Sequence, residues 1–160
     1  MLSFQTILHP TDFSANSAAA FQLACSLARD HSARLIVLHV AAPLVAIYGD
    51  GIVPVALEPE VQREDLAEQL RQVQPQGGQV RVEHQLADGD PALEILNAAR
   101  QSQCDLIVLG THGRTGLGRL LMGSVAEQVV RKAHCPVLTV KTPVPGATAS
   151  PALKQEPVQA

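Results

Sequence analysis

Short apolar runs alternate along the chain with segments of helical periodicity. The runs are Ile7–Leu8, Leu35–Val40, Val80–Leu86, Leu106–Leu109 and Val137–Val140. Most of them are unbroken by charge, which is typical of parallel strands covered on both faces. In the third run apolar and polar positions alternate instead, so we expect this strand to have one solvated face and to lie at a sheet edge.

The segments between the runs repeat with the period of a helix. Each has apolar residues on one face: Ala18, Phe21, Cys25 and Ala28; Leu66, Leu70 and Val73; Ala92, Ile95, Leu96 and Ala99; and Val125, Val129 and Ala133. Asp90 and Pro91 predict the start of the third helix, and Ser124 is expected to cap the fourth. The order βαβαβαβαβ predicts an α/β protein with a five-stranded, parallel, doubly wound open sheet, Rossmann-like in class.

Two segments fall outside this alternation. Residues 41–59 contain Pro43, Gly49, Gly51, Pro54 and Pro59 among small apolar residues, and we expect a long mobile loop there. Residues 142–160 carry four prolines among Ala, Ser, Thr and Gln, a composition that predicts a disordered tail. The 160-residue chain is therefore expected to hold one domain, residues 1–141.

Composition and charge narrow the function classes. The net charge of −3 is small and has the wrong sign for a protein held by nucleic-acid phosphates. No apolar run approaches the ~20 residues of a membrane span, and the N-terminus lacks the pattern of a secretory signal. We therefore expect a cytoplasmic protein that binds neither nucleic acid nor membrane.

The cysteines and histidines form no sequence cluster. Cys25, Cys104 and Cys135 contain no CxxC motif and are interpreted as small core residues of a reduced protein, with a redox sensor as the alternative. The six histidines are scattered, and no two lie four residues apart, as a helical metal pair would. They are interpreted as hydrogen-bonded or surface side chains, except His112, which can meet a phosphate from its glycine-rich segment.

In an open α/β sheet, ligands bind at the carboxyl ends of the strands. The segments that reach this edge are 9–14, 40–41, 87–90 and 110–124, and the last holds five of the eleven glycines. Glycines leave backbone N–H groups uncovered, and the segment ends at a helix start, where unpaired N–H groups and the macrodipole attract an anion. This pattern favours a phosphate site, with a flexible loop that binds nothing as the alternative.

Two common phosphate-binding motifs are absent. No Gly-Lys pair occurs, which excludes the Walker A motif. A G-x-G-x-x-G motif starting at Gly116 and Gly118 would need glycine where Leu121 stands, and it would follow the fourth strand instead of the first. Walker-type and dinucleotide-binding classes are therefore excluded.

The spacing that does occur is G-x2-G-x9-G-[ST], at Gly110, Gly113, Gly123 and Ser124. It resembles the nucleotide-binding signature of the universal stress protein family, in its ATP-binding branch. The resemblance extends in order over the blocks 7–8 with 10–14, 35–40, 105–110 and 134–138, and covers residues 3–141. It implies a fold of the adenine nucleotide alpha hydrolase-like kind.

The resemblance also implies the ligand and its contacts. Asp12 and Val40 match positions near adenine and ribose, although Asp12 is also placed as an acid near a helix N-terminus. The implied site comprises Pro10, Thr11, Asp12, Val40, Leu109, Gly110, His112, Gly113, Arg114, Gly123, Ser124 and Val125. Arg114 is the weaker match, with a solvated loop cation as the alternative. The expected ligand is ATP, ADP or AMP, with Mg²⁺ or Mn²⁺ carried by the nucleotide.

We expect a nucleotide-dependent stress-response or signalling protein whose 41–59 segment differs between ATP-bound and empty states. Without a water-activating residue, hydrolysis or autophosphorylation at Ser124 or Thr115 is expected to be slow at most. The resemblance implies a homodimer through residues 136–140, an apolar edge strand. The alternative to a nucleotide-dependent protein is a structural stress protein that acts without a nucleotide.

A phospho-acceptor receiver domain is the alternative from another class. Asp12, Asp88, Thr111 and Lys141 follow the strands roughly where its acids, hydroxyl and lysine would lie. Paired acids after the first strand are missing, however, and such a domain needs no glycine-rich fourth loop. A nucleotidylating enzyme would need a serine- and glycine-rich first loop, and an FMN carrier would need aromatic residues to stack on its ring.

Overall fold

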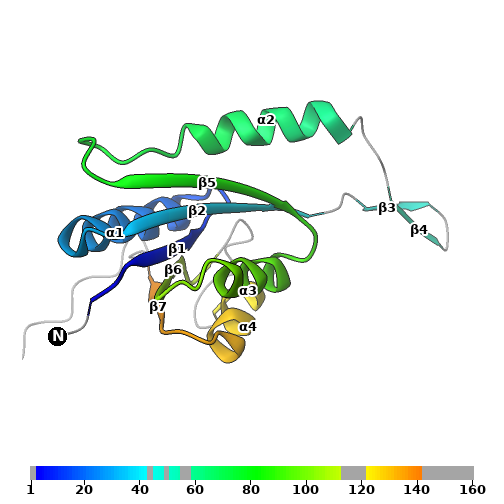
Figure 1. Ribbon diagram of the computed structural model, residues 1–160. Coiled ribbons are helices and arrows are strands. Elements are labelled where there is room, and N and C mark those ends of the chain that lie inside the picture. Colours follow the sequence, from blue (N-terminus) through cyan, green and yellow to red (C-terminus); the bar gives the residue numbers. More distant parts are fainter. Residues whose placement is uncertain (1–2, 43–44, 49–50, 55–58, 113–121, 142–160) are drawn as a thin grey trace, which may run out of the picture.

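The computed structural model describes residues 3–42, 45–48, 51–54, 59–112 and 122–141. Five strands form one parallel sheet in the order β5-β2-β1-β6-β7 (Figure 1). The strands are β1 (Thr6–Pro10), β2 (Arg34–Ala41), β5 (Arg81–Asp88), β6 (Leu106–Gly110) and β7 (Val137–Val140). The predicted five-stranded parallel sheet is confirmed, and the third and fifth apolar runs lie at its two edges as expected.

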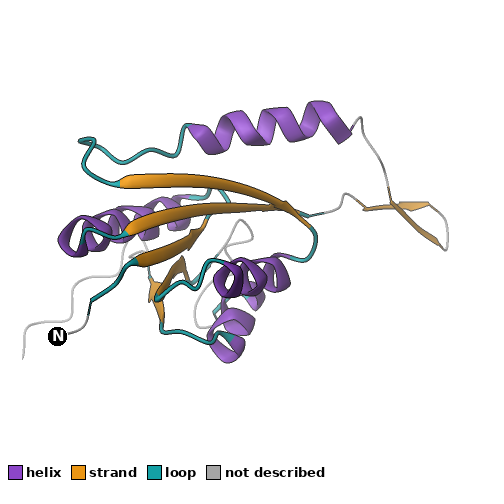
Figure 2. Cartoon of the chain, in the orientation of Figure 1, coloured by secondary structure: helices purple, strands orange, loops and turns teal. Residues whose placement is uncertain are grey.

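Two helices cover each face of this sheet (Figure 2). The helices α1 (Ala15–His31) and α2 (Pro59–Arg71) pack on one face, and α3 (Pro91–Gln101) and α4 (Ser124–Lys132) pack on the other. Neighbouring β2 residues alternate between the two cores, since Leu35 and Val37 face α1 while Ile36 and Leu38 face α3 and α4. Burial on both faces is the physical reason for the unbroken apolar run.

The parallel ladders differ in length across the sheet. β2 and β5 pair from Arg34–Arg81 to Ala41–Asp88, whereas β1 and β6 pair only at Ile7–Leu106 and Leu8–Ile107. Just before β6, a carboxylate oxygen of Asp105 accepts hydrogen bonds from the Gln5 and Thr6 amides, at 2.7 and 2.8 Å. This carboxylate therefore fastens the amino ends of β1 and β6 to each other.

The helix starts differ from one another. Ser14 caps α1, and Asp90 caps α3 as predicted, with its carboxylate accepting from the Leu93 amide at 2.9 Å. The prediction that Ser124 caps α4 is wrong: Gly123 is the N-cap, and Ser124 is the first helical residue, with an exposed side chain. The Gly123 amide donates to the Thr111 carbonyl at 2.7 Å, which holds Gly123 as the last residue before the helix.

The predicted helix faces need three small corrections. Ala18 is exposed, and Ser17 is buried in its place, because the Ser17 hydroxyl donates inward to Thr11 Oγ1 at 2.8 Å. Val73 lies beyond the end of α2 but still packs against the α1-side core. Ala133 is the C-cap of α4, not a residue within it.

The sequence predicted a long loop over residues 41–59, and this prediction is wrong for part of the segment. The segment includes an antiparallel pair, β3 (Val45–Tyr48) with β4 (Gly51–Pro54), and α2 already begins at Pro59. β-branched and aromatic residues flank the two-residue connection, a pattern that favours a hairpin. Figure 1 shows this hairpin set apart from the five-stranded sheet.

The two remaining sequence predictions concern the 142–160 segment and membrane-spanning helices. The 142–160 segment lies outside the described residues, so its disorder stays a prediction. None of the helices that the structure describes has the length and hydrophobicity of a transmembrane segment.

Candidate functional site

A pocket of about 270 Å³ lies at the carboxyl ends of β1, β2 and β6, beside the starts of α3 and α4. Strand order reverses here, because the chain continues from β1 to β2 on one side and places β6 on the other. All predicted site residues that the structure describes line it: Pro10, Thr11, Asp12, Val40, Leu109, Gly110, His112, Gly123, Ser124 and Val125. Gly113 and Arg114 lie outside the described residues.

The turn after β1 is held by its own polar side chains. Thr11 donates its amide to the Leu38 carbonyl at 2.8 Å, and its hydroxyl oxygen accepts from the Phe13 amide at 3.1 Å. The Asp12 carboxylate accepts from the Ser14 amide at 3.0 Å through one oxygen. Asp12 therefore holds the turn into α1, as its alternative placement predicted, and also lines the pocket, where its second oxygen can accept from a ligand.

The turn after β6 brings the start of α4 back to the sheet. Thr111 donates its amide to the Val140 carbonyl at 3.1 Å, and its own carbonyl accepts from the Gly123 amide. The Thr111 hydroxyl lies 3.0 Å from Nδ1 of His112, another lining residue. Residues twelve positions apart in the sequence thus meet at one rim of the pocket.

Gly110 has a packing role that its place in the signature does not reveal. A Cβ at this position would lie 3.1 Å from the carbonyl oxygen of Asn16 in α1, closer than ordinary van der Waals contact. Any side chain at residue 110 would therefore push the end of β6 and the α1 backbone apart by a few tenths of an ångström.

Among the described residues that line the pocket, the start of α4 provides an electropositive group. Gly123 supplies no side-chain cap, whereas α1 and α3 begin with a capping Ser14 and Asp90. The first N–H groups of a helix have no partner within the helix and carry the positive end of its dipole. Ser124 and Val125 belong to this first turn and line the pocket, so it can accept an anionic group.

Two buried histidines form hydrogen bonds with residues at or next to the pocket. The His9 ring is fully buried, with Nδ1 2.9 Å from the Val108 carbonyl and Nε2 3.5 Å from the Ser17 hydroxyl. Burial lowers the pKa of His9 to about 4, so its ring is neutral at physiological pH. His39 places Nδ1 2.8 Å from the Thr11 carbonyl and packs its ring on Phe13. Both are hydrogen-bonded core histidines, as the sequence interpretation had them.

Several lining residues were not predicted. They are Ser17, Leu38, His39, Pro91, Ile95, Thr111 and Ala126. Pro91 and Ile95 lie in the first turns of α3, which starts at the same sheet edge as α4. The rule that placed residues 87–90 at this edge could have found them, since the helix that follows a parallel strand begins there.

The receiver arrangement does not form. Its third strand lies beside the first, whereas here β2 separates β5 from β1. Asp88 at the end of β5 instead forms an ion pair with Arg63 of α2. Within the described part of the chain, no three His, Cys, Asp or Glu side chains are close enough to hold a metal ion.

Comparison with known proteins identifies related chains. The sequence profile of the universal stress protein family matches residues 3–141. Universal stress protein MJ0531 of Methanocaldococcus jannaschii is 38% identical over 144 residues, which cover 88% of this chain and 84% of that protein. Universal stress protein UspA from Lactobacillus plantarum has a similar structure, with a TM-score of 0.69 and 26% identity over 88% of this chain and 99% of that one.

Two further solved structures share the fold and are described with ligands. One is a universal stress protein in complex with cAMP, at a TM-score of 0.60 and 24% identity, covering 88% of this chain and 98% of that one. The other is the universal stress protein from Archaeoglobus fulgidus in complex with dAMP, at 0.57 and 22%, covering 87% and 98%.

Proposed function

The chain belongs to the universal stress protein family, and from this premise we propose that it binds an adenine nucleotide in the pocket between β1 and β6. The observation that carries the proposal is the pocket itself. One cavity gathers the turn after β1, the end of β2 and the uncapped start of α4. In the proposed complex, the first two would face the adenosine and the start of α4 would face the phosphates.

The residues present fit such a ligand. The amides at the start of α4 and the Ser124 hydroxyl can donate to phosphate oxygens. The Asp12 carboxylate can accept from a ribose hydroxyl or from the adenine amino group. The aliphatic side chains of Leu38, Val40 and Ile95 line the pocket and can pack on the base without a stacked aromatic ring. A nucleotide would bring the charge and any metal ion that travels with it.

Related structures support the ligand class. Two neighbours are described as complexes with cAMP and dAMP, and both ligands are adenine nucleotides. We propose the same class here, with ATP as the first candidate and ADP and AMP as competitors. We further propose a binding protein with at most slow hydrolysis, because the Asp12 carboxylate already accepts from the Ser14 amide and the His112 ring lies against the Thr111 hydroxyl. The cytoplasmic location stays a prediction.

Isothermal titration of nucleotide-stripped protein tests the proposal. We expect saturable heat with ATP, ADP or AMP and weaker or no binding of GTP. The Asp12→Asn variant is expected to lose about tenfold in affinity, because a hydrogen bond to a charged group is worth ~1.5 kcal/mol. The matched control is Asp30→Asn at the exposed end of α1, which should bind as the parent does. Absence of heat with all three adenine nucleotides at high micromolar ligand would refute the proposal.

We also propose that the chain forms a homodimer through β7. This strand is an edge of the sheet, and the exposed side of β7 carries Leu138, 37% exposed. An unpaired apolar edge is an incomplete sheet that a second copy can extend or cover.

A further inference from the structure

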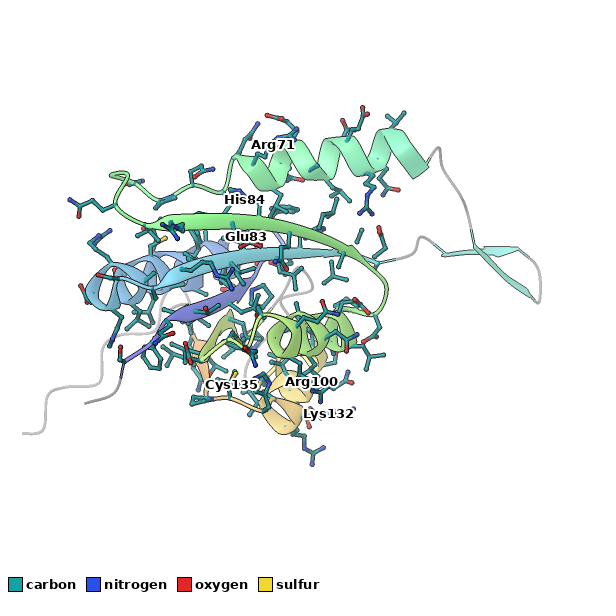
Figure 3. All side chains as sticks on the ribbon, viewed as in Figure 1. Arg71, Glu83, His84, Arg100, Lys132 and Cys135 are labelled. Carbon is teal, nitrogen blue, oxygen red and sulfur yellow. The ribbon has the colours of Figure 1, made fainter. Side chains whose placement is uncertain are left out.

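Two thiols meet at the end of the sheet opposite the pocket. Cys104 precedes β6, Cys135 precedes β7, and their sulfur atoms lie 3.6 Å apart. Figure 3 shows Cys135 at the amino end of β7, on the side of α3 and α4. The two residues are 31 positions apart in the sequence, which conceals the pair.

The fold itself brings the thiols together. β6 and β7 are parallel neighbours, so the turns that enter them lie side by side. Gln103 has a left-handed backbone, with φ of 50°, and the Cys104 amide donates to the Ala99 carbonyl at 3.1 Å. The Pro136 carbonyl accepts from the Ile107 amide at 3.0 Å. Backbone hydrogen bonds therefore fix both turns, and the sulfur contact belongs to the folded state.

We propose that Cys104 and Cys135 are an oxidisable thiol pair that forms an intramolecular disulfide when the protein meets a peroxide. The proposal is independent of the proposed nucleotide site. Its balance is two thiols and one hydrogen peroxide giving one disulfide and two waters. The Cys135 sulfur first attacks a peroxide oxygen, breaking the O–O bond and leaving a sulfenic acid and water. The Cys104 sulfur then attacks the Cys135 sulfur, and the sulfenic oxygen leaves as the second water.

The environments of the two thiols set this order. Cys135 is half-buried, whereas Cys104 is 3% exposed, so peroxide reaches Cys135 first. Burial raises the pKa of both thiols, but a hydrogen bond from Cys104 partly offsets this rise in the pKa of Cys135. Cys104 is further disfavoured as a thiolate by the neighbouring Cys135 charge. Because the thiolate is the nucleophile, we expect oxidation to be slow at neutral pH and to accelerate about tenfold per pH unit towards pH 9.

Cys25 provides an internal comparison. Its thiol is also buried, but it lies in the α1-side core on the opposite face of the sheet from the pair. Burial raises the pKa of Cys25 to about 11. Because Cys25 is buried on the other face of the sheet from both remaining thiols, it has no thiol within reach, and we expect it to stay reduced while the pair oxidises.

The disulfide would close a loop that contains β6, residues 110–123 and α4. Cross-linking a loop of this length restricts the unfolded chain. We expect the melting temperature of the oxidised protein to rise by roughly 5–10 °C, and the rise to vanish when dithiothreitol restores the thiols.

Peroxide treatment of the full chain tests the proposal. The protein is incubated with excess hydrogen peroxide at pH 7, 8 and 9, quenched by thiol alkylation, and analysed by intact mass and non-reducing peptide mapping. The expected result is a single chain, with no covalent link to a second copy, that takes one alkyl group instead of three after denaturation, with the Cys104 and Cys135 peptides joined, and reversal by dithiothreitol. Cys25→Ala is the matched control and should form the same cross-link at the same rate.

Other outcomes would overturn the proposal. They are a disulfide between two chains, a cross-link that includes Cys25, oxidation of Cys135 to sulfinic acid without a cross-link, or three unreacted thiols at pH 9. Cys104→Ala should convert Cys135 to a sulfenic acid that dimedone traps. If that variant does not fold, the peptide map of the unmodified chain decides alone.

Discussion

At the residue scale, His9 couples the stability of the fold to pH. Its ring is fully buried between the Val108 carbonyl and the Ser17 hydroxyl, and burial lowers its pKa from 6.5 to about 4. The unfolded chain therefore binds a proton at this position between pH 6.5 and 4, and the folded chain does not. Stability from this residue is complete above pH 6.5 and falls as the pH drops towards 4.

Replacement of His9 tests this coupling. Between pH 7.5 and 5, the parent protein should lose about 2 kcal/mol of unfolding free energy that a His9→Asn variant does not lose. Urea denaturation at the two pH values measures the difference, whatever stability the variant has at pH 7.5. His134→Asn at an exposed position is the control and should keep the parental pH dependence. Equal pH dependence in parent and His9→Asn would show that His9 does not titrate in this range.

At the element scale, the uncapped start of α4 can be tested for its effect on stability and, separately, for its effect on ATP binding. Asp is a preferred N-cap residue, and a Gly123→Asp substitution would supply an acceptor and a negative charge to the first turn. We expect this variant to be at least as stable as the parent in thermal melts, yet to bind ATP at least tenfold more weakly. Gly123→Ala, which brings neither acceptor nor charge, is the matched control. Equal ATP affinity in the Asp and Ala variants would place the phosphates elsewhere.

Some of the strands, turns and caps could be predicted from the sequence, and others could not. The strands of the main sheet were visible because burial on both faces leaves unbroken apolar runs. The β3–β4 hairpin was missed because Pro and Gly signals outweighed its short β-branched segments. The cap at Gly123 was missed because its position depends on a hydrogen bond to Thr111, a contact between turns. The spacing of the glycine signature predicts lining residues that lie in the signature itself. It does not predict residues such as Ile95, which lines the pocket because α3 begins at the same sheet edge.

At the scale of the whole molecule, the exposed edge strand β7 predicts the oligomeric state. Light scattering coupled to size exclusion should give a particle of twice the 17.0 kDa chain mass at micromolar concentration. Leu138→Lys should shift it towards the monomer, because charge on an edge strand opposes pairing. Val61→Lys on exposed α2 is the control and should leave the dimer intact. A monomeric parent protein would contradict the proposed dimer.

The unequal ladders of the sheet have a mechanical consequence. β1 and β6 share a short ladder that the Asp105 carboxylate fastens at its amino end, while the pocket lies at its carboxyl end. Beyond the ladder, on the side of the pocket, the ring of His9 in β1 places Nδ1 2.9 Å from the Val108 carbonyl of β6. β1 and β6 are thus clamped by side chains at both ends of their short ladder, so opening the mouth of the pocket by separating them would require breaking the buried His9 hydrogen bond.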